Sequence, residues 1–423
     1  TVVVSPLIAL MEDQTLELRE WGIPAAYLNS TLSYKEHLET VKRIRACEVK
    51  LVYAAPETLL KPETVVLLED CPVDCLVIDE AHCISEWGHD FRPEYRQLAG
   101  LRTRIPEAVT LAVTATATRR VRQDIKKSLG IVDANEFISS FNRENLALTV
   151  VDKIAPASQT RAFLDAHKGQ AGIIYCVTRD QVDNLNAQLK SNGYQALPYH
   201  AGMDDETRRA HQHRFRYEEG FIMVATIAFG MGINKSNIRF VLHYDLPKNL
   251  ESYYQQIGRA GRDGLPADCL LLYSYSDVRT IRYFIEQQAP EQRRGSETRL
   301  KALLNFVDSR ICRRVPLLEY FGEKYPEDNC GACDNCLEDS RENARLSDQD
   351  KKPVEDLDSV KVDLSEPTRV FLKCAHETGE IFGVDHLINI LRGSKAKKVL
   401  KFHHDELPSY SKGKSNSKRY WQH

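Results

Sequence analysis

The chain has 423 residues, of which 42% are hydrophobic and 28% charged, and its formal net charge is −3. This length predicts two to four domains, each able to bury a core. The slightly negative charge excludes a uniformly basic nucleic-acid-binding protein but allows local basic surfaces. No apolar run approaches the length of a membrane span, so we expect a cytoplasmic protein.

Short apolar runs alternate with helical patterns along most of the chain. Strands are predicted at residues 1–5, 50–54, 75–78, 109–113, 172–176, 221–226, 239–244 and 268–273. The patterns between them, such as Thr118 to Leu129, suit helices that cross between parallel strands. Because the alternation starts again after residues 141–146, the sequence predicts an α/β protein with two tandem parallel-sheet lobes.

Two carboxylates, Asp79 and Glu80, directly follow the strand predicted at residues 75–78. Ligands of α/β sheets bind at the carboxyl ends of the strands. Asp79 is suited to hold Mg²⁺, and Glu80 can orient and deprotonate a water that attacks a γ-phosphate. A polar strand end that caps the next helix is the alternative. The buried strand before these residues favours a nucleoside triphosphatase.

The loop that begins at His82 is rich in aromatic and basic side chains. It contains Trp87, His89, Phe91 and Arg92. Flat aromatic and guanidinium faces can stack on unpaired bases. A candidate hydrolytic pair and a candidate nucleic-acid surface therefore lie close together in the sequence.

A glycine-rich segment, residues 258–264, carries Arg259 and Arg262. The two arginines would share one face if the segment were helical. A rigid guanidinium stabilises charge on a γ-phosphate, and such an arginine finger is typically worth about 10³ to 10⁵ in turnover. Two solvated arginines at a helix end are the alternative, which is disfavoured because helices rarely contain so many glycines.

Four of the eleven cysteines form a cluster in the sequence, Cys312, Cys330, Cys333 and Cys336. Four thiolates at this spacing suit tetrahedral zinc. A disulfide is not expected in the reducing cytosol, and a redox dithiol would leave two cysteines unexplained. An iron–sulfur cluster also uses four cysteines, so the residues alone leave that alternative open.

The end of the chain is polar and basic. Residues 338–366 are charged and poor in aliphatic side chains, as in a linker. Helices are predicted at residues 368–376 and 384–391, followed by lysines that include Lys395 and Lys398. A solvated charged face is the alternative. We favour contact with duplex phosphates because an acidic chain concentrates positive charge here.

Together these motifs resemble those of RecQ-family DNA helicases. The Asp-Glu-Ala-His tetrapeptide with its aromatic loop, the segment from Tyr253 to Gly264, which is similar to motif VI, and the cysteine cluster carry the resemblance. It implies two RecA-like lobes, a helical zinc-binding subdomain and a partial winged helix, and it selects zinc as the metal. The implied boundaries are lobe 1 at 1–142, lobe 2 at 143–288, the zinc-binding domain at 289–340, a linker at 341–366 and the winged helix at 367–423.

The resemblance implies roles for individual residues. The implied catalytic residues are Asp79, Glu80, His82, Arg259 and Arg262. The implied nucleotide contacts are Asp79, Asn234, Gln255, Arg259 and Arg262. The implied DNA contacts are Ser5, Trp87, Phe91, Arg92, Thr178, Lys395 and Lys398.

We also interpret the threonine-rich segment at residues 114–118 and the side chain of Gln256. The segment Thr114 to Thr118 resembles motif III, which couples hydrolysis to DNA binding, whereas Thr118 itself is expected to cap a helix. Gln256 stands where the family more often has Glu, so its role is left open.

The implied activity is that of an ATP-dependent helicase. It would use ATP and Mg²⁺ to move 3′ to 5′ along one strand and separate duplex DNA, in repair, recombination and replication. The implied partners are single-stranded and duplex DNA, with single-strand-binding protein as a further candidate, and in a bacterium the protein would associate with the nucleoid. A non-catalytic zinc and winged-helix DNA-binding adaptor and an RNA helicase are the alternatives. The intact acidic pair and arginines disfavour the first, and the aromatic loop with the cysteine cluster disfavours the second.

Such a motor also needs a glycine-rich phosphate loop that ends in Lys-Ser/Thr. The only Gly-Lys-Ser begins at Gly413, but Pro408 stands where the loop would need its first glycine. In the family this loop precedes motif Ia, which Ser5 to Leu7 resembles, so we expect the loop to lie before Thr1 and the winged helix to stop short. We therefore expect a partial helicase sequence that binds DNA and zinc but has little or no ATPase activity of its own.

Overall fold

The computed structural model describes residues 1–6, 8–88, 90–230, 235–338, 365–379, 382–414 and 421. The chain divides into two compact units, Thr1–Leu346 and Ser347–His423. The first unit contains two parallel sheets, and the second is a small helical body with its own core. Within the described residues, no helix combines the length and the apolar character that crossing a bilayer requires.

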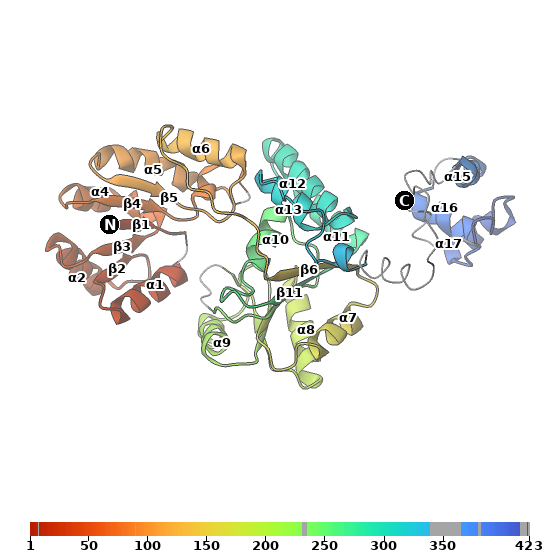
Figure 1. Cartoon of the computed structure of the whole chain (residues 1–423), viewed down its shortest axis with the longest axis horizontal. Helices are drawn as coiled ribbons and strands as arrows, with labels where there is room; N and C mark the ends of the chain where they lie inside the picture. Colours follow the sequence, from red (N-terminus) through yellow and green to blue (C-terminus); the bar gives the residue numbers. More distant parts are fainter. Residues whose placement is uncertain are drawn as a thin grey trace. The chain divides into compact units, whose positions relative to one another are not determined.

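Lobe 1 is a five-stranded parallel sheet in the order β2-β3-β1-β4-β5. Its strands are β1 (Val2–Val4), β2 (Ala25–Leu28), β3 (Leu51–Ala54), β4 (Cys75–Ile78) and β5 (Val109–Ala112). Its helices are α1 (Ile8–Glu20), α2 (Tyr34–Arg45), α3 (Pro56–Leu59), α4 (Pro62–Glu69), α5 (Pro93–Arg104) and α6 (Arg119–Leu129), with a 3₁₀ turn η1 (Ala81–Ile84) after β4. Helices lie on both sides of this sheet (Figure 1), so its central strands are apolar throughout, as β1 illustrates.

Lobe 2 is a six-stranded parallel sheet in the order β6-β11-β10-β7-β9-β8. Its strands are β6 (Leu146–Asp152), β7 (Gly172–Tyr175), β8 (Ala196–Tyr199), β9 (Ile222–Ala225), β10 (Phe240–His243) and β11 (Ala267–Tyr273). Its helices are α7 (Pro156–Asp165), α8 (Arg179–Ser191), α9 (Asp205–Tyr217), α10 (Leu250–Ile257) and α11 (Tyr275–Glu286). Two tandem parallel-sheet lobes, as predicted, are therefore confirmed.

Alternate residues of the lobe 2 strands bury into two different cores. Ile173, Val241 and Leu271 belong to a core shared with α10, α11 and the helices that follow. Their neighbours Ile174 and Leu242 belong to the core under α7 and α8. This is the period-two pattern of a sheet that is covered on both faces.

Two helices, α12 (Pro290–Asp308) and α13 (Arg314–Phe321), continue the first core beyond lobe 2. In Figure 1 they lie on the side of the lobe 2 sheet opposite α7 and α8. The polar residues 290–298 form the first turns of α12. Ala289 precedes the helix, and Pro290, whose ring fixes φ at a helical value, starts it. The polar side chains of these turns are mostly exposed, so their composition resembles that of a loop.

The second unit contains α15 (Ser365–Glu377), α16 (Val384–Leu391), α17 (Lys397–Lys401) and a 3₁₀ turn η2 (His404–Glu406). Both helices predicted in this region are present, although α15 starts a little earlier than expected. Their apolar faces meet around Cys374, Leu387 and Val399, all of which are buried. This small core gives the unit its own hydrophobic centre.

One close approach in lobe 2 can be tested. Gly172 of β7 pairs with Phe240 of β10, and a Cβ added at Gly172 would overlap the phenyl ring. Gly172→Ala should therefore destabilise the protein by about 1–3 kcal/mol, as overpacked core substitutions do. The free energy of unfolding in urea measures this change.

Gly100→Ala is the matched control. Gly100 lies within α5, and a Cβ there would have no atom within 4 Å. Because alanine favours a helix interior over glycine, this variant should be neutral or more stable. Equal stability of the two variants would contradict the packing that we describe for Gly172.

Candidate active site and metal centre

The two carboxylates lie at the carboxyl edge of the lobe 1 sheet, where β4 runs between β1 and β5. The backbone N–H of Asp79 donates to the Val4 carbonyl at 2.9 Å, so the sheet still fixes the chain at this residue. Glu80 has a positive φ of 48° and donates its N–H to Asp79 Oδ1 at 2.8 Å. A glutamate in the left-handed region is uncommon, and such strain is concentrated at functional sites.

The charge state of Asp79 reflects this setting. Burial and then the neighbouring Glu80 carboxylate raise the pKa of Asp79 above its usual value. A divalent cation next to the two acids would favour the charged form and offset both effects. The donor set, two carboxylates at a strand end, therefore fits Mg²⁺.

His82 connects this acidic pair to a second strand end. Its side chain is buried, and Nδ1 lies 2.9 Å from Thr114 Oγ1 and 3.2 Å from Glu80 Oε2. The Thr114 hydroxyl also accepts the N–H of Thr116 at 3.3 Å. Residues 114–116, which follow β5, are called the threonine strap below. As expected, the next threonine, Thr118, caps α6 and accepts the N–H of Val121.

The other end of the threonine strap contacts lobe 2. Gln255 of α10 donates from Nε2 to Thr116 Oγ1 at 3.2 Å. The strap is therefore bonded at one end to His82 of lobe 1 and at the other to the helix that precedes the two arginines. An ion pair of 3.2 Å between Asp13 and Arg216 also joins the lobes.

Arg259 and Arg262 lie in the turns that follow α10, so the condition for a shared helix face is not met. The helix ends at Ile257, and Gly261 takes a positive φ of 57° that a helix does not allow. The buried guanidinium of Arg259 donates to the Gly230 carbonyl.

The positive charge of Arg259 nevertheless affects Arg262. Burial, followed by the positive charges of Arg259 and Arg143, lowers the pKa of Arg262. A polyphosphate would relieve this accumulation of positive charge.

Gln256, which was left open, hydrogen-bonds a buried histidine. Its Oε1 lies 2.7 Å from His243 Nε2, and both side chains are buried. The imidazole lies between the rings of Tyr175 and Tyr253, at centroid distances of 5.5 and 5.1 Å. Burial lowers the pKa of His243 to about 4. Sequence reasoning missed His243 because a lone histidine at the end of an apolar strand carries no motif.

Two described rings of the aromatic loop, residues 85–92, are each faced by an arginine. The Trp87 side chain is 44% exposed, and Arg120 Cζ lies 3.2 Å from its ring centroid. Phe91 has Arg96 at 5.2 Å. Arg92 pairs with Asp90 at 3.2 Å and donates to the Pro6 carbonyl at 3.3 Å, so it connects the loop to motif Ia.

The remaining predicted DNA contacts lie in different settings. Ser5 is fully buried, whereas Lys395 in the second unit is exposed. The exposed Thr178 caps α8 by accepting the N–H of Gln181. His89, Asn234 and the side chain of Lys398 lie outside the described part of the chain.

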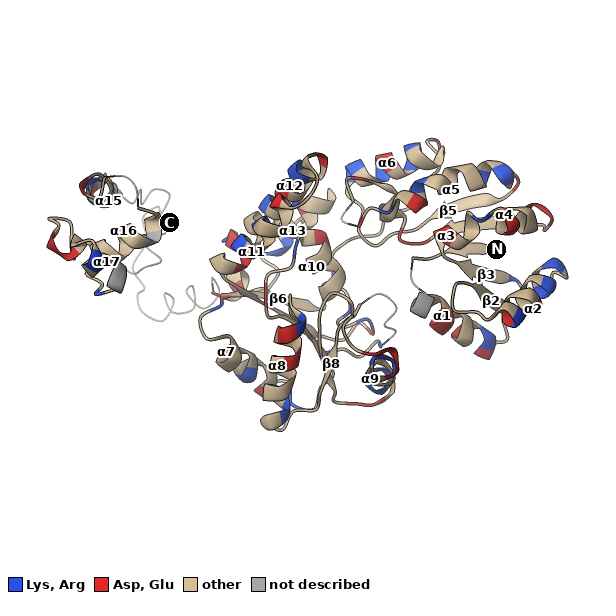
Figure 2. Cartoon of the chain, turned by 180° about the vertical axis from the view of Figure 1, so that it is seen from behind, with Lys and Arg blue, Asp and Glu red and all other residues tan. Residues whose placement is uncertain are grey.

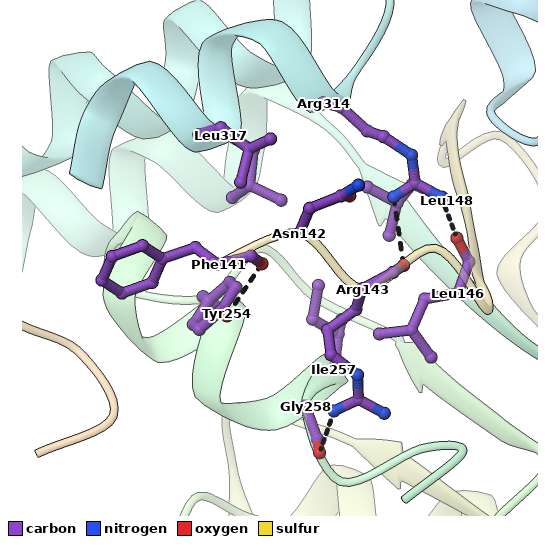
Figure 3. Close-up of a pocket in the computed structure, with 11 residues that line it drawn as sticks. Phe141, Asn142, Arg143, Leu146, Leu148, Tyr254, Ile257, Gly258, Arg314 and Leu317 are labelled. Atoms are coloured by element: carbon purple, nitrogen blue, oxygen red, sulfur yellow. Dashed lines mark hydrogen bonds between the residues drawn. The ribbon is translucent and has the colours of Figure 1, made fainter. Parts of the chain in front are cut away.

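The lobe junction, residues 141–146, is packed between α10 and α13 (Figure 3). The Phe141 carbonyl accepts the Tyr254 hydroxyl at 2.9 Å, and Arg314 donates to the carbonyls of Arg143 and Leu146 at 3.2 and 3.0 Å. The cavity between them measures about 10 Å³, which is roughly the space of one water and too small for a ligand. The junction is therefore a packed joint that connects motif VI to the metal-binding subdomain.

The four predicted cysteines converge. The sulfurs of Cys312, Cys330, Cys333 and Cys336 all lie within 4.8 Å of one another. Tetrahedral zinc with Zn–S bonds of about 2.3 Å needs sulfurs about 3.8 Å apart, and the Cys330–Cys336 distance is 3.9 Å. The donor set therefore fits zinc.

Backbone and ion-pair contacts hold this cluster in place. The N–H groups of Arg313 and Cys330 donate to the sulfurs of Cys333 and Cys336 at 3.4 and 3.3 Å. Two 2.9 Å hydrogen bonds join the Arg313 guanidinium to Asp334, which in turn accepts the N–H of Val150 on β6. The metal centre is thereby attached to the edge of the lobe 2 sheet.

The fold and these sites define a two-lobed protein of the DEAD/DEAH-box helicase class. The DEAD/DEAH box helicase model matches residues 1–125 and the helicase conserved C-terminal domain matches residues 155–264. The RecQ zinc-binding model matches residues 275–337 and the RQC domain residues 358–423.

Similar proteins agree with these matches. "ATP-dependent DNA helicase RecQ" of Pasteurella multocida is 40% identical over 423 residues, which is 100% of this chain and 64% of that protein. Its Bacillus subtilis namesake is 41% identical over 97% of this chain and 66% of its own length. The chain belongs to the RecQ family, and it spans slightly less than two thirds of these relatives.

Solved structures support the fold alone. The DEAD-box helicase Mss116, bound to single-stranded RNA and UDP-BeF, superposes with a TM-score of 0.53 at 19% identity, covering 68% of this chain and 62% of that one. S. cerevisiae Dbp5, bound to RNA and ADP BeF3, gives 0.50 at 17% identity over 71% and 81% of the two chains.

The zinc centre predicts a specific loss on substitution. Cys333→Ser should abolish binding of about one zinc per chain, because three remaining thiolates do not complete the tetrahedral site. It should also lower the melting temperature, since Cys333 belongs to the core that lobe 2 and α12 share. Zinc content by atomic emission and thermal unfolding by circular dichroism measure both effects.

Cys47→Ser is the control, because Cys47 is exposed and lies in lobe 1. This variant should retain zinc and stability. Full zinc content in Cys333→Ser would refute the four-cysteine site.

His243 predicts how stability depends on pH. Its pKa is about 4 in the folded protein, below the unfolded value of 6.5, so only the unfolded state takes up the proton in between. This contribution is fully present above pH 6.5 and is lost as the pH falls toward 4, by up to about 3 kcal/mol.

The measurement compares the wild type with His243→Asn, which cannot titrate. Urea unfolding at pH 7 and pH 5 should show a larger loss of stability for the wild type. An equal loss in both proteins would mean that His243 is not buried in its neutral form.

Proposed function

We propose that this chain is the core of an ATP-dependent DNA helicase that moves 3′ to 5′ along one strand and separates the duplex. One observation carries the proposal. The threonine strap is bonded to His82, beside the acidic pair, and to Gln255, on the helix that precedes the arginines. A change at the nucleotide can therefore reach both lobes through a direct chain of hydrogen bonds.

In this proposal the acidic pair carries out hydrolysis. Asp79 holds Mg²⁺, which when bound neutralises charge on the phosphates. Glu80 accepts a proton from the attacking water, and His82, whose Nδ1 lies 3.2 Å from Glu80 Oε2, is placed to orient it. The raised pKa of Asp79 supports a site that is completed by a cation.

Lobe 2 contributes positive charge at the nucleotide. Arg259 and Arg262 stabilise charge on the γ-phosphate, and Gln255 and Asn234 contact the nucleotide nearby. The lowered pKa of Arg262, which burial and the nearby charges of Arg259 and Arg143 cause, supports an anion as the ligand of this segment. Hydrolysis removes the γ-phosphate and weakens this attraction, so the lobes can separate.

Nucleic acid contacts complete the proposal. Trp87, Phe91 and Arg92 of the aromatic loop contact single-stranded DNA. Ser5, Thr178, Lys395 and Lys398 add contacts to the backbone. The relatives' name, "ATP-dependent DNA helicase RecQ", supports DNA over RNA.

The finer organisation follows the same family. We assign lobe 1 to 1–142, lobe 2 to 143–288, the zinc-binding domain to 289–340, a linker to 341–366 and a winged helix to 367–423. Repair, recombination and replication, together with single-strand-binding protein and, in a bacterium, the nucleoid, provide the setting in which such a motor works.

Two substitutions in the full-length gene product test the proposal. Glu80→Gln should lower the rate of hydrolysis by at least about 10²-fold while DNA binding is retained, because it removes the general base alone. Trp87→Ala should retain basal hydrolysis but lose its stimulation by DNA. Phosphate release with and without single-stranded DNA, and fluorescence anisotropy for binding, are the assays.

Trp21→Ala is the control, because Trp21 is 69% exposed in lobe 1 and lies outside the site. Its stimulation by DNA should match that of the wild type. Normal stimulation in Trp87→Ala, or normal turnover in Glu80→Gln, would refute the corresponding role.

A further inference from the structure

The beginning of α6 lies against the aromatic loop at two points. The Ser85 hydroxyl, which is fully buried, donates to Asp124 Oδ2 of α6 at 2.6 Å and accepts the N–H of Trp87 at 3.2 Å. One turn earlier on the helix, the Arg120 guanidinium lies 3.2 Å from the centre of the Trp87 ring. The first contact fixes the loop backbone, and the second covers a face of its exposed ring.

The Arg120 contact differs from the other cation–ring contact of the loop. Arg96, which faces Phe91, is held by Glu86 at 2.7 Å and by the Ile84 carbonyl at 3.2 Å. Arg120 is exposed, and within the described parts of the chain no carboxylate pairs with it. Its guanidinium is therefore free to leave the ring without breaking an ion pair.

The geometry points to Arg120 as a latch on the base-stacking face of Trp87. We propose that Arg120 occupies this face when no nucleic acid is bound, that an unpaired base displaces it, and that the released guanidinium binds a phosphate of the same strand. The proposal rests on the proposed function and adds a nucleic-acid-binding residue to it.

Relative interaction strengths favour the exchange. Stacking of a base on an aromatic ring is stronger than a cation–π contact at an exposed site, so the base displaces the arginine. The guanidinium then regains a partner, because phosphate accepts its hydrogen bonds in a bidentate manner. Neither group is left without an interaction at the end of the exchange.

Arg120 lies near the start of α6, so its displacement by a base would also affect this helix. It lies two residues after Thr118, the cap of α6, and α6 directly follows the segment that contains the threonine strap. Parts of the α6 ribbon are blue in Figure 2, the colour of Lys and Arg, and its last turn contains Lys126 and Lys127, so other phosphates of the strand also meet positive charge there. Arrival of a base thus acts on the helix that adjoins the strap between the two lobes.

The test uses the 423-residue chain with Trp21→Phe and Trp421→Phe, which leaves Trp87 as the only tryptophan of the three. Without DNA, Arg120→Ala should expose the second face of the ring and roughly double quenching of Trp87 fluorescence by acrylamide. Arg119→Ala is the matched control, because Arg119 is the exposed neighbour on the same turn and should leave quenching unchanged.

A second measurement follows the released guanidinium. Binding of oligo-dT is measured by anisotropy over a salt series, and Arg120→Ala should reduce the slope of log K against log salt by about 0.7, the value for one phosphate of a single strand. Arg120→Lys should keep most of this slope, because the ammonium also binds phosphate.

The outcomes separate the latch from the function on which it rests. Unchanged quenching in Arg120→Ala, or an unchanged salt slope, would overturn the latch while the wild type still binds DNA. If the wild type failed to bind oligo-dT, the proposed function would be refuted and the latch with it. Increased quenching together with a reduced slope would support the latch.

Discussion

The contact between the two lobes of the first unit depends on two hydroxyl groups, those of Thr114 and Thr116, which lie two residues apart. The Thr114 hydroxyl is hydrogen-bonded to His82 of its own lobe, and the Thr116 hydroxyl accepts a hydrogen bond from Gln255 of the other lobe. Because residues in such a short segment move together, displacement of one end shifts the other. Hydrogen bonds of this kind are individually modest, at about 1 kcal/mol each. They can therefore break and re-form during a working cycle, which a large apolar interface would oppose.

Lobe 2 and the metal centre behave as one body by contrast. Phe306 of α12 and Cys333 belong to the same core as the lobe 2 strands, and Arg313 with Asp334 ties the cysteine cluster to β6. The junction at Phe141 stacks on Phe321 at 4.7 Å, so the chain that joins the lobes is anchored in this body. Zinc held by these cysteines would thus stabilise the part of the molecule that contains the two arginines.

The sequence predicted the central strands of both sheets and the edge strand β5, and it missed the other three edge strands, β2, β6 and β8. An edge strand has one neighbour and need not be apolar throughout, and β8 even contains Pro198, which edge strands tolerate. The predictions for the site also depended on how local each signal is. Carboxylates after a buried strand and cysteines at fixed spacing are local patterns, so they were predictable. The contacts Gln255–Thr116 and Gln256–His243 join residues far apart in the sequence, and no local pattern signals them.

The unusual charges of the site share one physical origin. Burial and a like-charged neighbour raise the pKa of Asp79 in lobe 1, and burial and like-charged neighbours lower the pKa of Arg262 in lobe 2. A cation at Asp79 and a polyphosphate at the arginines would stabilise the charged forms of both. Electrostatic attraction to the proposed nucleotide would therefore favour closure of the two lobes. Its hydrolysis would weaken this attraction, because the γ-phosphate that attracts the arginines departs.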